Sequence, residues 1–341
     1  MTATAAAIPD WACSLLACPG GQGRTAVQEE RIVDGGGRML GRVDAGVLRF
    51  AVNEDASVEY YRAIGGAHFH ERGGTPFAMS ALDTPVYHGY LRRLQTLDRD
   101  GVIVDVGSGD GRNALPWLER GYKKVVLVDP VAAALRRFRD RIEAQNAAWL
   151  NNILLIEADA RALPLLDGCA HRVLAIESLY YLNEDYEQGL GECRRIMRSD
   201  GLLLLSDRDY EGGLLTRLLY GGVERFIAQG SSRDVWDGMG NERIRTRCFT
   251  QAEMISLVKR QGLHVRESLG ISAFALVLGF LAGLDRLGTE AQTRRAEVSK
   301  LLSGLGTHGM MRRCNVLIVS HKRRSTPTRK TTPRVAPKRR G

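Results

Sequence analysis

The sequence predicts an α/β fold, a doubly wound, mostly parallel sheet of seven strands with helices on both faces. β-branched runs typical of buried strands alternate with helical runs such as VAAALRRFRDRIEAQNA. Acidic residues follow several of these strands, and ligands bind at the carboxyl ends of parallel strands. With 341 residues, 44% of them hydrophobic, the chain can bury one full α/β domain and smaller attachments.

The first predicted strand runs into a glycine-rich loop, VIVDVGSGDGR, from Val102 to Arg112. Glycines let the backbone turn sharply and approach a ligand closely. A phosphate-binding P-loop would end in Gly-Lys-Ser/Thr, which is missing here, and a dinucleotide fingerprint would have a glycine where Arg112 stands. Asp105 and Asp110 would repel a pyrophosphate, whereas acids suit the cationic sulfonium and ammonium groups of S-adenosylmethionine.

The second predicted strand, Lys124 to Val128, ends on Asp129, which is 22 residues after Gly107. An acid at about this distance bonds both hydroxyls of a ribose in nucleotide-binding sites. A single acid after a strand is commonly a helix cap or a turn residue. The prediction of a nucleoside site therefore depends on several such acids occurring together.

Later segments complete the predicted sheet. NILLIEAD ends on Asp159, HRVLAIES ends on Glu177 and Ser178, and ECRRIMRSDGLLLLSDRD supplies a helix, a glycine turn and a fifth strand. Thr250 and Glu253 form a capping box before an amphipathic helix. HVRESLG and CNVLIVSHK are the sixth and seventh strands.

The stretch VDVGSGDGR resembles the first motif of the Rossmann-like (class I) S-adenosylmethionine-dependent methyltransferases, type 11-like, with an acid two residues before a G-x-G-x-G loop. The resemblance extends from about Gly101 to Lys322, and the family has its last strand antiparallel beside the sixth. It implies that S-adenosylmethionine is the cofactor, that Asp105 orients the methionine ammonium group, and that Asp159 and the backbone of Ala160 bind adenine. The cofactor-binding residues that it implies are Asp105, Gly107, Ser108, Gly109, Gly111, Asp129, Pro130, Asp159, Ala160 and Glu177.

The candidate catalytic residues follow the fourth strand and are Glu177, Tyr180 and Tyr181. The family has residues that face the methyl group at the position of Glu177. If the acceptor is a phenol, an amine or an acidic carbon, we expect Glu177 to take its proton, with His68 or His70 as the other candidate bases; a helix cap and a cofactor contact are the alternative roles of Glu177. The tyrosines offer aromatic faces to the sulfonium or to a planar acceptor, or pack in the core.

A helical cap, residues 56–100, precedes this domain and contains three candidates for the substrate pocket, Tyr61, His68 and His70. The resemblance implies that such a cap closes over the cofactor and the acceptor. The histidine pair could begin a metal site, but no third ligand can be placed, so we expect no metal there.

The N-terminal segment, residues 1–55, resembles the small zinc-ribbon-like segment that precedes the methyltransferase domain in some bacterial proteins. Gly21 occupies the position of its second cysteine, and no second cysteine pair follows Cys18. One thiolate cannot hold a structural zinc, so we expect a degenerate, metal-free segment. The six cysteines of the chain are scattered, which implies no disulfides.

The methyltransferase domain, residues 101–322, contains two unusual insertions, 210–247 and 271–311, where we expect substrate choice to be determined. The second insertion begins with ISAFALVLGFLAGL, 14 residues that are too few for a transmembrane helix, which needs about 20. We expect a core or pocket-lid helix without integral membrane insertion; contact with a membrane surface is the alternative.

A basic tail, residues 323–341, ends the chain. From Lys322 onward there are nine Lys or Arg and no acid, so the net charge of +9 lies entirely at this end. The tail is rich in Pro and Thr and lacks apolar periodicity, which predicts disorder. It is either solvated or a weak tether to nucleic acid or another polyanion. No signal peptide is evident at the N-terminus, so we expect a cytoplasmic protein.

The resemblance implies a methyltransferase, and we expect a small-molecule acceptor. The alternatives are a methyltransferase that acts on nucleic acid or protein, as the basic tail suggests, and an S-adenosylmethionine-binding protein that is not catalytic or performs another transfer. Against nucleic acid, ESLYYL lacks the Asn/Asp-Pro-Pro-aromatic signature of base amino-group methylation, and the chain has no Pro-Cys nucleophile.

Overall fold

A computed structural model of the chain describes residues 8–21, 23–65, 79–229, 232–237, 244–283, 295–307 and 311–322. The pocket candidates His68 and His70 lie outside the described residues, as does the basic tail, residues 323–341.

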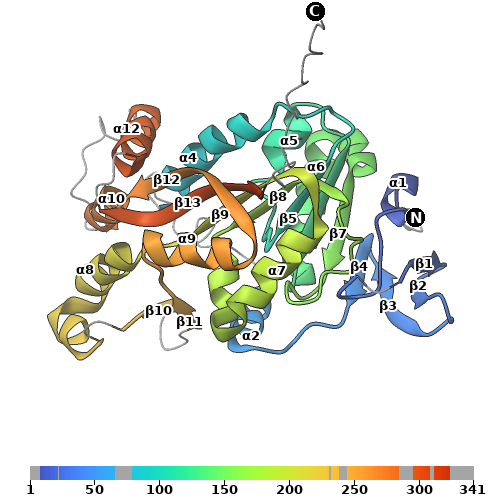
Figure 1. The fold of residues 1–341 in the computed structure, drawn as a ribbon, viewed down its shortest axis with the longest axis horizontal. Helices are drawn as coiled ribbons and strands as arrows, with labels where there is room; N and C mark the ends of the chain where they lie inside the picture. The colour runs from blue at the N-terminus through green and yellow to red at the C-terminus, as the bar shows by residue number, and fades with distance from the viewer. Residues whose placement is uncertain are drawn as a thin grey trace, which may run out of the picture.

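Seven neighbouring strands of a larger sheet follow the order β7-β6-β5-β8-β9-β13-β12, with β12 at the outer edge (Figure 1). The first five are parallel, and β13 is antiparallel to both of its neighbours, so the predicted doubly wound, mostly parallel α/β class is confirmed. The strand bounds are β5 Val102–Val106, β6 Lys124–Asp129, β7 Ile153–Glu157, β8 Ala170–Ile176, β9 Met197–Arg208, β12 Leu263–Ser272 and β13 Arg312–His321.

Helices cover both faces of this sheet, and each face has its own hydrophobic core. Val102 and Val104 of β5 pack in one core, and Ile103 between them packs in the other. A strand buried on both faces is continuously apolar, which explains the unbroken β-branched run in the sequence. The helices between these strands are α5 Leu115–Glu119, α6 Ala132–Asn146, α7 Tyr186–Ile196 and α9 Gln251–Arg260. The predicted capping box of Thr250 and Glu253 begins α9.

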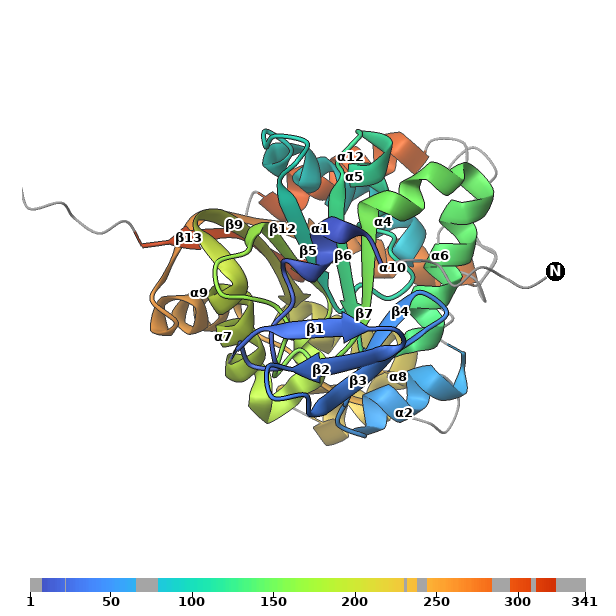
Figure 2. The same cartoon turned by 90° about the vertical axis from the view of Figure 1, so that its right-hand side faces the viewer.

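The sheet is larger than seven strands because the N-terminal segment joins its edge (Figure 2). A short helix, α1, is followed by an antiparallel meander whose last strand, β4, pairs in parallel with β7. Arg49 of β4 forms an ion pair with Glu157 of β7, which fixes this edge. The bounds are α1 Asp10–Cys13, β1 Thr25–Gln28, β2 Arg31–Asp34, β3 Met39–Asp44 and β4 Val47–Phe50.

The predicted cap contains two described helices, α2 (Ala56–Ala63) and α4 (Met79–Leu94). Helix α4 packs its Leu82, Tyr87 and Leu91 side chains into the core that also contains Ile103. Helix α4 is therefore a permanent layer of the domain and not only a lid. The division of the chain into a segment, a cap, a domain and a tail stays a prediction.

The two insertions form helices and a hairpin. The first contains α8 (Tyr210–Gln229) and a hairpin of β10 (Asp234–Asp237) and β11 (Ile244–Arg247). The second contains α10 (Phe274–Gly283) and α12 (Arg295–Thr307). Helix α10, expected as a core or lid helix, has Ala275 and Leu276 buried, and the Phe280 ring lies edge-on to Tyr220 of α8 with ring centroids 5.5 Å apart.

Among the described residues, no helix combines the length and the apolar character needed to cross a membrane. In the same part of the chain, no group of three or more His, Cys, Asp or Glu side chains is arranged to hold a metal ion. Cys13 and Cys18 of the N-terminal segment are free thiols.

Candidate functional site

A cavity of about 340 Å³ lies at the carboxyl ends of the parallel strands, a volume within the usual range for small-molecule sites. The strand order reverses between β5 and β8, and ligands in open α/β sheets bind at such a point. The strand ends that line the cavity are Val106 and Gly107 after β5, Val128 and Asp129 of β6, Ala158 and Asp159 after β7, and Glu177 and Ser178 after β8.

The glycine loop after β5 turns in a way that only glycine tolerates easily. Gly107 has φ +70°, and a Cβ atom there would lie 2.3 Å from Cβ of Ser178. The amide of Gly107 donates to the carbonyl of Val128 at 2.8 Å, which ties the loop to β6. Gly107 and Gly109 line the cavity, whereas Gly111 is packed against Phe138.

Asp129 lies at the cavity wall and holds two backbone amides. One carboxylate oxygen accepts from the amide of Gly109 at 2.7 Å, and the other accepts from the amide of Val131 at 2.9 Å. Burial raises the pKa of Asp129 to about 6, although these two hydrogen bonds oppose the shift. The neighbouring Pro130 also lines the cavity. Asp129 therefore fixes the loop and presents a carboxylate at the end of β6.

Asp105 and Ser108 lie behind this wall. Asp105 is 1% exposed, and its Oδ2 has no hydrogen-bond partner among the described residues; the same is true of Oγ of Ser108. Burial raises the pKa of Asp105 to about 7, while the charge of Arg112 opposes the shift. An unpartnered buried carboxylate beneath the glycine loop fits a cationic ligand group, directly or through water.

Asp159, at the end of the third predicted strand, is already paired. Its carboxylate accepts from Nε and Nη2 of Arg161 at 2.9 and 2.8 Å, and Arg161 also pairs with Asp55, which immediately precedes α2, and with Asp185. These contacts lower the pKa of Asp159, although its burial acts in the opposite direction. Ala160 lies beside Asp159 in the cavity wall. This end of the cavity carries more acids than bases.

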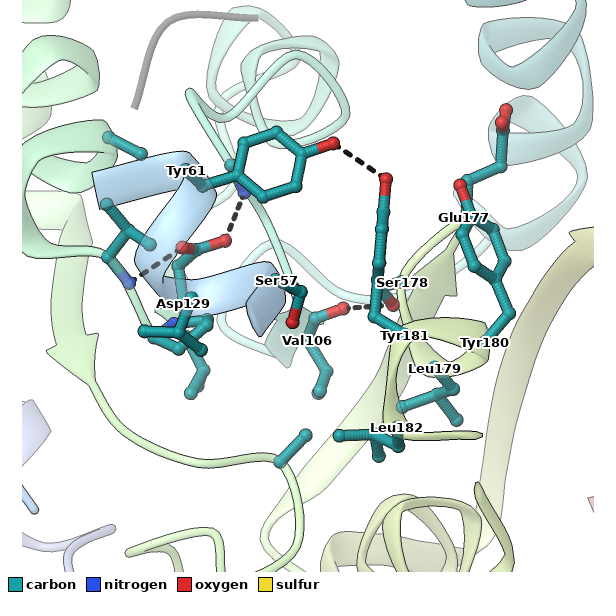
Figure 3. A pocket seen from close by; sticks show the side chains of 18 of the residues that line it. Ser57, Tyr61, Val106, Asp129, Glu177, Ser178, Leu179, Tyr180, Tyr181 and Leu182 are labelled. Atoms are coloured by element: carbon teal, nitrogen blue, oxygen red, sulfur yellow. Dashed lines mark hydrogen bonds between the residues drawn. The ribbon is translucent and has the colours of Figure 1, made fainter. Parts of the chain in front are cut away.

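Three tyrosines close the cavity on one side. The hydroxyl groups of Tyr61 in α2 and Tyr181 are 2.6 Å apart, and Tyr180 stacks against Tyr181 with ring centroids at 4.6 Å (Figure 3). Tyr180 and Tyr181 belong to a 3-10 helix, Leu179–Asp185, that follows β8. The structure thus brings Tyr61 of the cap together with both candidate tyrosines of the domain.

Glu177 lies across the cavity from Asp129 (Figure 3). Its Oε1 accepts from Nη2 of Arg313 at 2.7 Å and from the hydroxyl of Tyr87 at 2.9 Å, and Nη2 of Arg112 is 3.7 Å away. Burial alone would raise the pKa of Glu177, but the charges of Arg313 and Arg112 outweigh it and lower the pKa to about 2. Glu177 is therefore a fixed anion across the physiological pH range and a weak base.

Six charged residues of the cavity wall were not predicted as site residues. They are Asp55 before α2, Asp83 of α4, Arg112 of the glycine loop, Arg161 after β7, Arg208 at the end of β9 and Arg313 of β13. Arg208 lies 4.9 Å from the ring centroid of Tyr180 and donates to Thr246 of β11, so the first insertion contacts the site. Arg208 could have been predicted as a site residue, because it lies at the end of a predicted strand. Asp83 and Arg313 could not, because they lie outside the predicted motifs.

A family model described as a methyltransferase domain matches residues 103–201. Two curated relatives match part of the chain. The ubiquinone/menaquinone biosynthesis C-methyltransferase UbiE of Acidiphilium cryptum is 36% identical over 99 residues, 29% of this chain and 39% of that protein. The malonyl-[acyl-carrier protein] O-methyltransferase of Xylella fastidiosa is 33% identical over 121 residues, 34% of this chain and 39% of that protein. The chain thus spans about two fifths of the length of these relatives.

Solved structures with a similar backbone share little sequence with this chain. The 1,6-didemethyltoxoflavin-N1-methyltransferase of Burkholderia thailandensis, solved with S-adenosylhomocysteine, is 15% identical at a TM-score of 0.49 and covers 87% of this chain and 98% of its own. A structure described as a putative S-adenosylmethionine-dependent methyltransferase of Listeria monocytogenes is 11% identical at a TM-score of 0.47, with 71% and 100% covered.

Proposed function

We propose that this chain, whose residues 103–201 form a Rossmann-like S-adenosylmethionine-dependent methyltransferase domain, transfers a methyl group from S-adenosylmethionine to a small organic acceptor. One observation supports the proposal above all others. A single cavity is lined by residues at the ends of β5, β6, β7 and β8, and β5 to β8 lie almost entirely within residues 103–201. The proposal keeps the cytoplasmic location expected from the sequence.

We assign the cofactor to the strand ends as follows. Asp129 would bond the ribose hydroxyls, because both of its oxygens keep lone pairs beyond those used by the two amides. Asp105 would balance the methionine ammonium from behind the glycine loop. The adenine would lie toward Asp159 and Ala160. Because Arg161 already donates to both oxygens of the Asp159 carboxylate, we expect the backbone of Ala160 to contribute more of the hydrogen bonding to adenine than Asp159 does.

The acceptor would lie at the other end of the cavity, beside Glu177, Tyr180 and Tyr181. S-adenosylmethionine supplies a methyl group that is already activated by the positive charge on sulfur. The protein must then mainly align the acceptor atom with that methyl group, and alignment can supply roughly 7–11 kcal/mol of the barrier. The aromatic faces of Tyr180 and Tyr181 suit a sulfonium or a planar acceptor.

We assign Glu177 a positioning role and not that of a base. Its contacts with Arg313, Arg112 and Tyr87 fix these three side chains around the acceptor end. A carboxylate whose pKa is about 2 takes a proton poorly at neutral pH.

A small acceptor is favoured over a polymer because the described residues form a cavity of about 340 Å³, a volume typical of small-molecule sites. The Tyr61–Tyr181 contact joins the cap to the domain across one side of it. The curated relatives include one named for ubiquinone and menaquinone biosynthesis and one named for a malonyl group on a carrier protein, and each name describes that protein alone.

The experiment is a label-transfer assay. We would incubate the purified chain with methyl-labelled S-adenosylmethionine and a host extract, and then separate small molecules from nucleic acid and protein. Label in the small-molecule fraction, absent without the protein, supports the proposal. Label in a polymer would contradict the small acceptor, and no label despite cofactor binding would contradict catalysis.

A further inference from the structure

Two buried carboxyl groups share one guanidinium at the acceptor end of the cavity. Nη2 of Arg313 donates to Oδ2 of Asp83 and, at 2.7 Å, to Oε1 of Glu177. The two acids come from different elements, Asp83 from α4 and Glu177 from the end of β8, and both line the cavity. Arg313 is itself almost fully buried, with 7% of its side chain exposed. One cation thus faces two acids at the place where we expect the acceptor.

The surroundings of the two acids differ. Glu177 has Arg313, the Tyr87 hydroxyl and Arg112 around it, and its pKa is about 2. Asp83 is 2% exposed, and among the described residues its Oδ1 has no hydrogen-bond partner. Burial raises the pKa of Asp83 to about 7; the charges of Arg313 and Arg112 lower it, and the charge of Glu177 raises it. Two carboxyl groups whose environments separate their pKa values commonly divide into a fixed anion and a proton carrier.

We propose that Asp83 accepts the proton of the methyl acceptor, which therefore has an ionisable O–H, N–H or C–H bond at the atom that receives the methyl group. This inference rests on the proposed methyltransferase function and names a class of substrate for the same site. Oδ1 of Asp83, which has no hydrogen-bond partner among the described residues, is the atom that takes the proton, while Oδ2 stays on Arg313. An acceptor that is already an anion, such as a carboxylate, would need no such base.

The step balances. An O–H or N–H acceptor forms the bond to the methyl carbon with a lone pair, and a C–H acceptor forms it with the electron pair of the C–H bond that breaks. The carbon–sulfur bond breaks with its electrons going to sulfur, and the proton of the acceptor moves to Oδ1 of Asp83. The products are the methylated acceptor, S-adenosylhomocysteine and protonated Asp83, which then gives its proton to water.

The other ionisable groups at this end fit the role less well. Tyr87 is fully buried, and burial raises its pKa well above the usual value, so its hydroxyl stays protonated. Tyr87 already donates to Glu177 and is 2.7 Å from the hydroxyl of Ser206. Arg112 and Arg313 remain charged and can only donate hydrogen bonds.

The test measures the rate of label transfer as a function of pH. The substrate is the small-molecule fraction of the host extract that takes up the label, and this fraction is kept dilute so that the rate reports kcat/KM. For the parent protein, we expect the rate to rise as pH increases to about 7 and then to level, since Asp83 must lose its proton first. Asp83→Asn should lower the rate at least about 100-fold and remove this pH dependence. Its affinity for S-adenosylhomocysteine, measured by calorimetry, should stay within about threefold of the parent.

Asp207→Asn is the matched control. Asp207 is also buried, and burial raises its pKa to about 8, but it bonds Tyr186 and is not among the described residues that line the cavity. The control variant should keep the pH profile of the parent. A profile that Asp83→Asn leaves unchanged would overturn the inference, as would an identical loss in Asp207→Asn.

Glu177→Gln tests the inference if Asp83→Asn does not fold. The charge of Glu177 raises the pKa of Asp83, so its removal should move the rising part of the profile to lower pH. An unmoved profile would contradict the role of Asp83. If the parent transfers label to no fraction, the proposed function itself fails and the inference fails with it; if the parent transfers label and the variants behave like the parent, only the inference fails.

Discussion

Replacing Asp129 with alanine is the sharpest probe of the cofactor site. The substitution removes the acceptor of two backbone hydrogen bonds, from Gly109 at 2.7 Å and from Val131 at 2.9 Å, and the proposed contact to the ribose hydroxyls. A hydrogen bond to a charged group contributes about 1.5–3 kcal/mol. Loss of the ribose contact should therefore weaken S-adenosylmethionine binding roughly 10- to 200-fold.

The same substitution should also destabilise the protein. Each buried amide left without an acceptor costs about 1–3 kcal/mol. The cost is smaller for the amide of Gly109, because Gly109 lines the cavity, where water can replace the lost acceptor. The destabilisation must be separated from the effect on binding, so affinity should be measured by calorimetry at a temperature where both proteins are folded, with NAD as the comparison ligand.

Asp34→Ala supplies a matched control for the lost backbone contacts. Oδ1 of Asp34 accepts from the amides of Gly36 and Arg38, both at 2.9 Å, in the turn after β2. This variant should bind S-adenosylmethionine like the parent. Parent-like affinity in Asp129→Ala or equal weakening in the control would refute the assignment of Asp129, and tight NAD binding by the parent would refute S-adenosylmethionine as the ligand of this site.

Three further predictions concern stability. Gly107→Ala should destabilise the protein by more than about 1 kcal/mol, as measured by urea denaturation, because φ is +70° and the new Cβ would lie 2.3 Å from Cβ of Ser178; a neutral effect would contradict this loop geometry. Asp207 has a pKa raised by burial to about 8, so the folded protein keeps a proton that the unfolded chain releases, and the free energy of unfolding should fall as pH rises from about 4 to 8. Asp207→Asn should flatten that fall over the same pH range, and an unchanged slope would show that other groups cause it. A double-mutant cycle of Tyr61→Phe and Tyr181→Phe should give a coupling of about 0.5–1.5 kcal/mol in the free energy of unfolding, and additive effects would show that the 2.6 Å contact adds no stability.

Strands β5 to β8 were predictable because each has a local signal. Their apolar runs are buried on both faces, and an acid or a glycine loop marks where each of these four ends. The resemblance to the methyltransferases and the α/β class follow from these local patterns. The sheet confirms the class, and a family model described as a methyltransferase domain matches residues 103–201. The sequence also predicted which strand ends would meet, since parallel strands end at one edge of a sheet.

The pairing of charges was not predictable in the same way. Arg313 and Asp83 are 230 residues apart, and nothing near either one indicates the other. Arg49 and Glu157, which fix the added edge of the sheet, are likewise distant in the chain. The pairing of Arg161 with Asp159 could have been predicted, because Arg161 follows Asp159 by two residues. The motif, however, indicated only that the Asp159 carboxylate faces the ligand.

The same difficulty applies to Glu177. The sequence predicts a base at the end of the fourth strand, and Glu177 at this position does line the cavity. Its proton affinity depends on Arg112 and Arg313, which tertiary structure brings beside it. A residue's place in a motif therefore predicts its location better than its protonation.

A crystal structure of the chain with S-adenosylhomocysteine tests the central claim most directly. The account predicts the ribose hydroxyls within hydrogen-bonding distance of Asp129, the adenine beside Ala160, and the sulfur directed toward the end of the cavity where Asp83 and Glu177 meet Arg313. A ligand bound elsewhere, or one in this cavity with its sulfur directed away from that end, would contradict it.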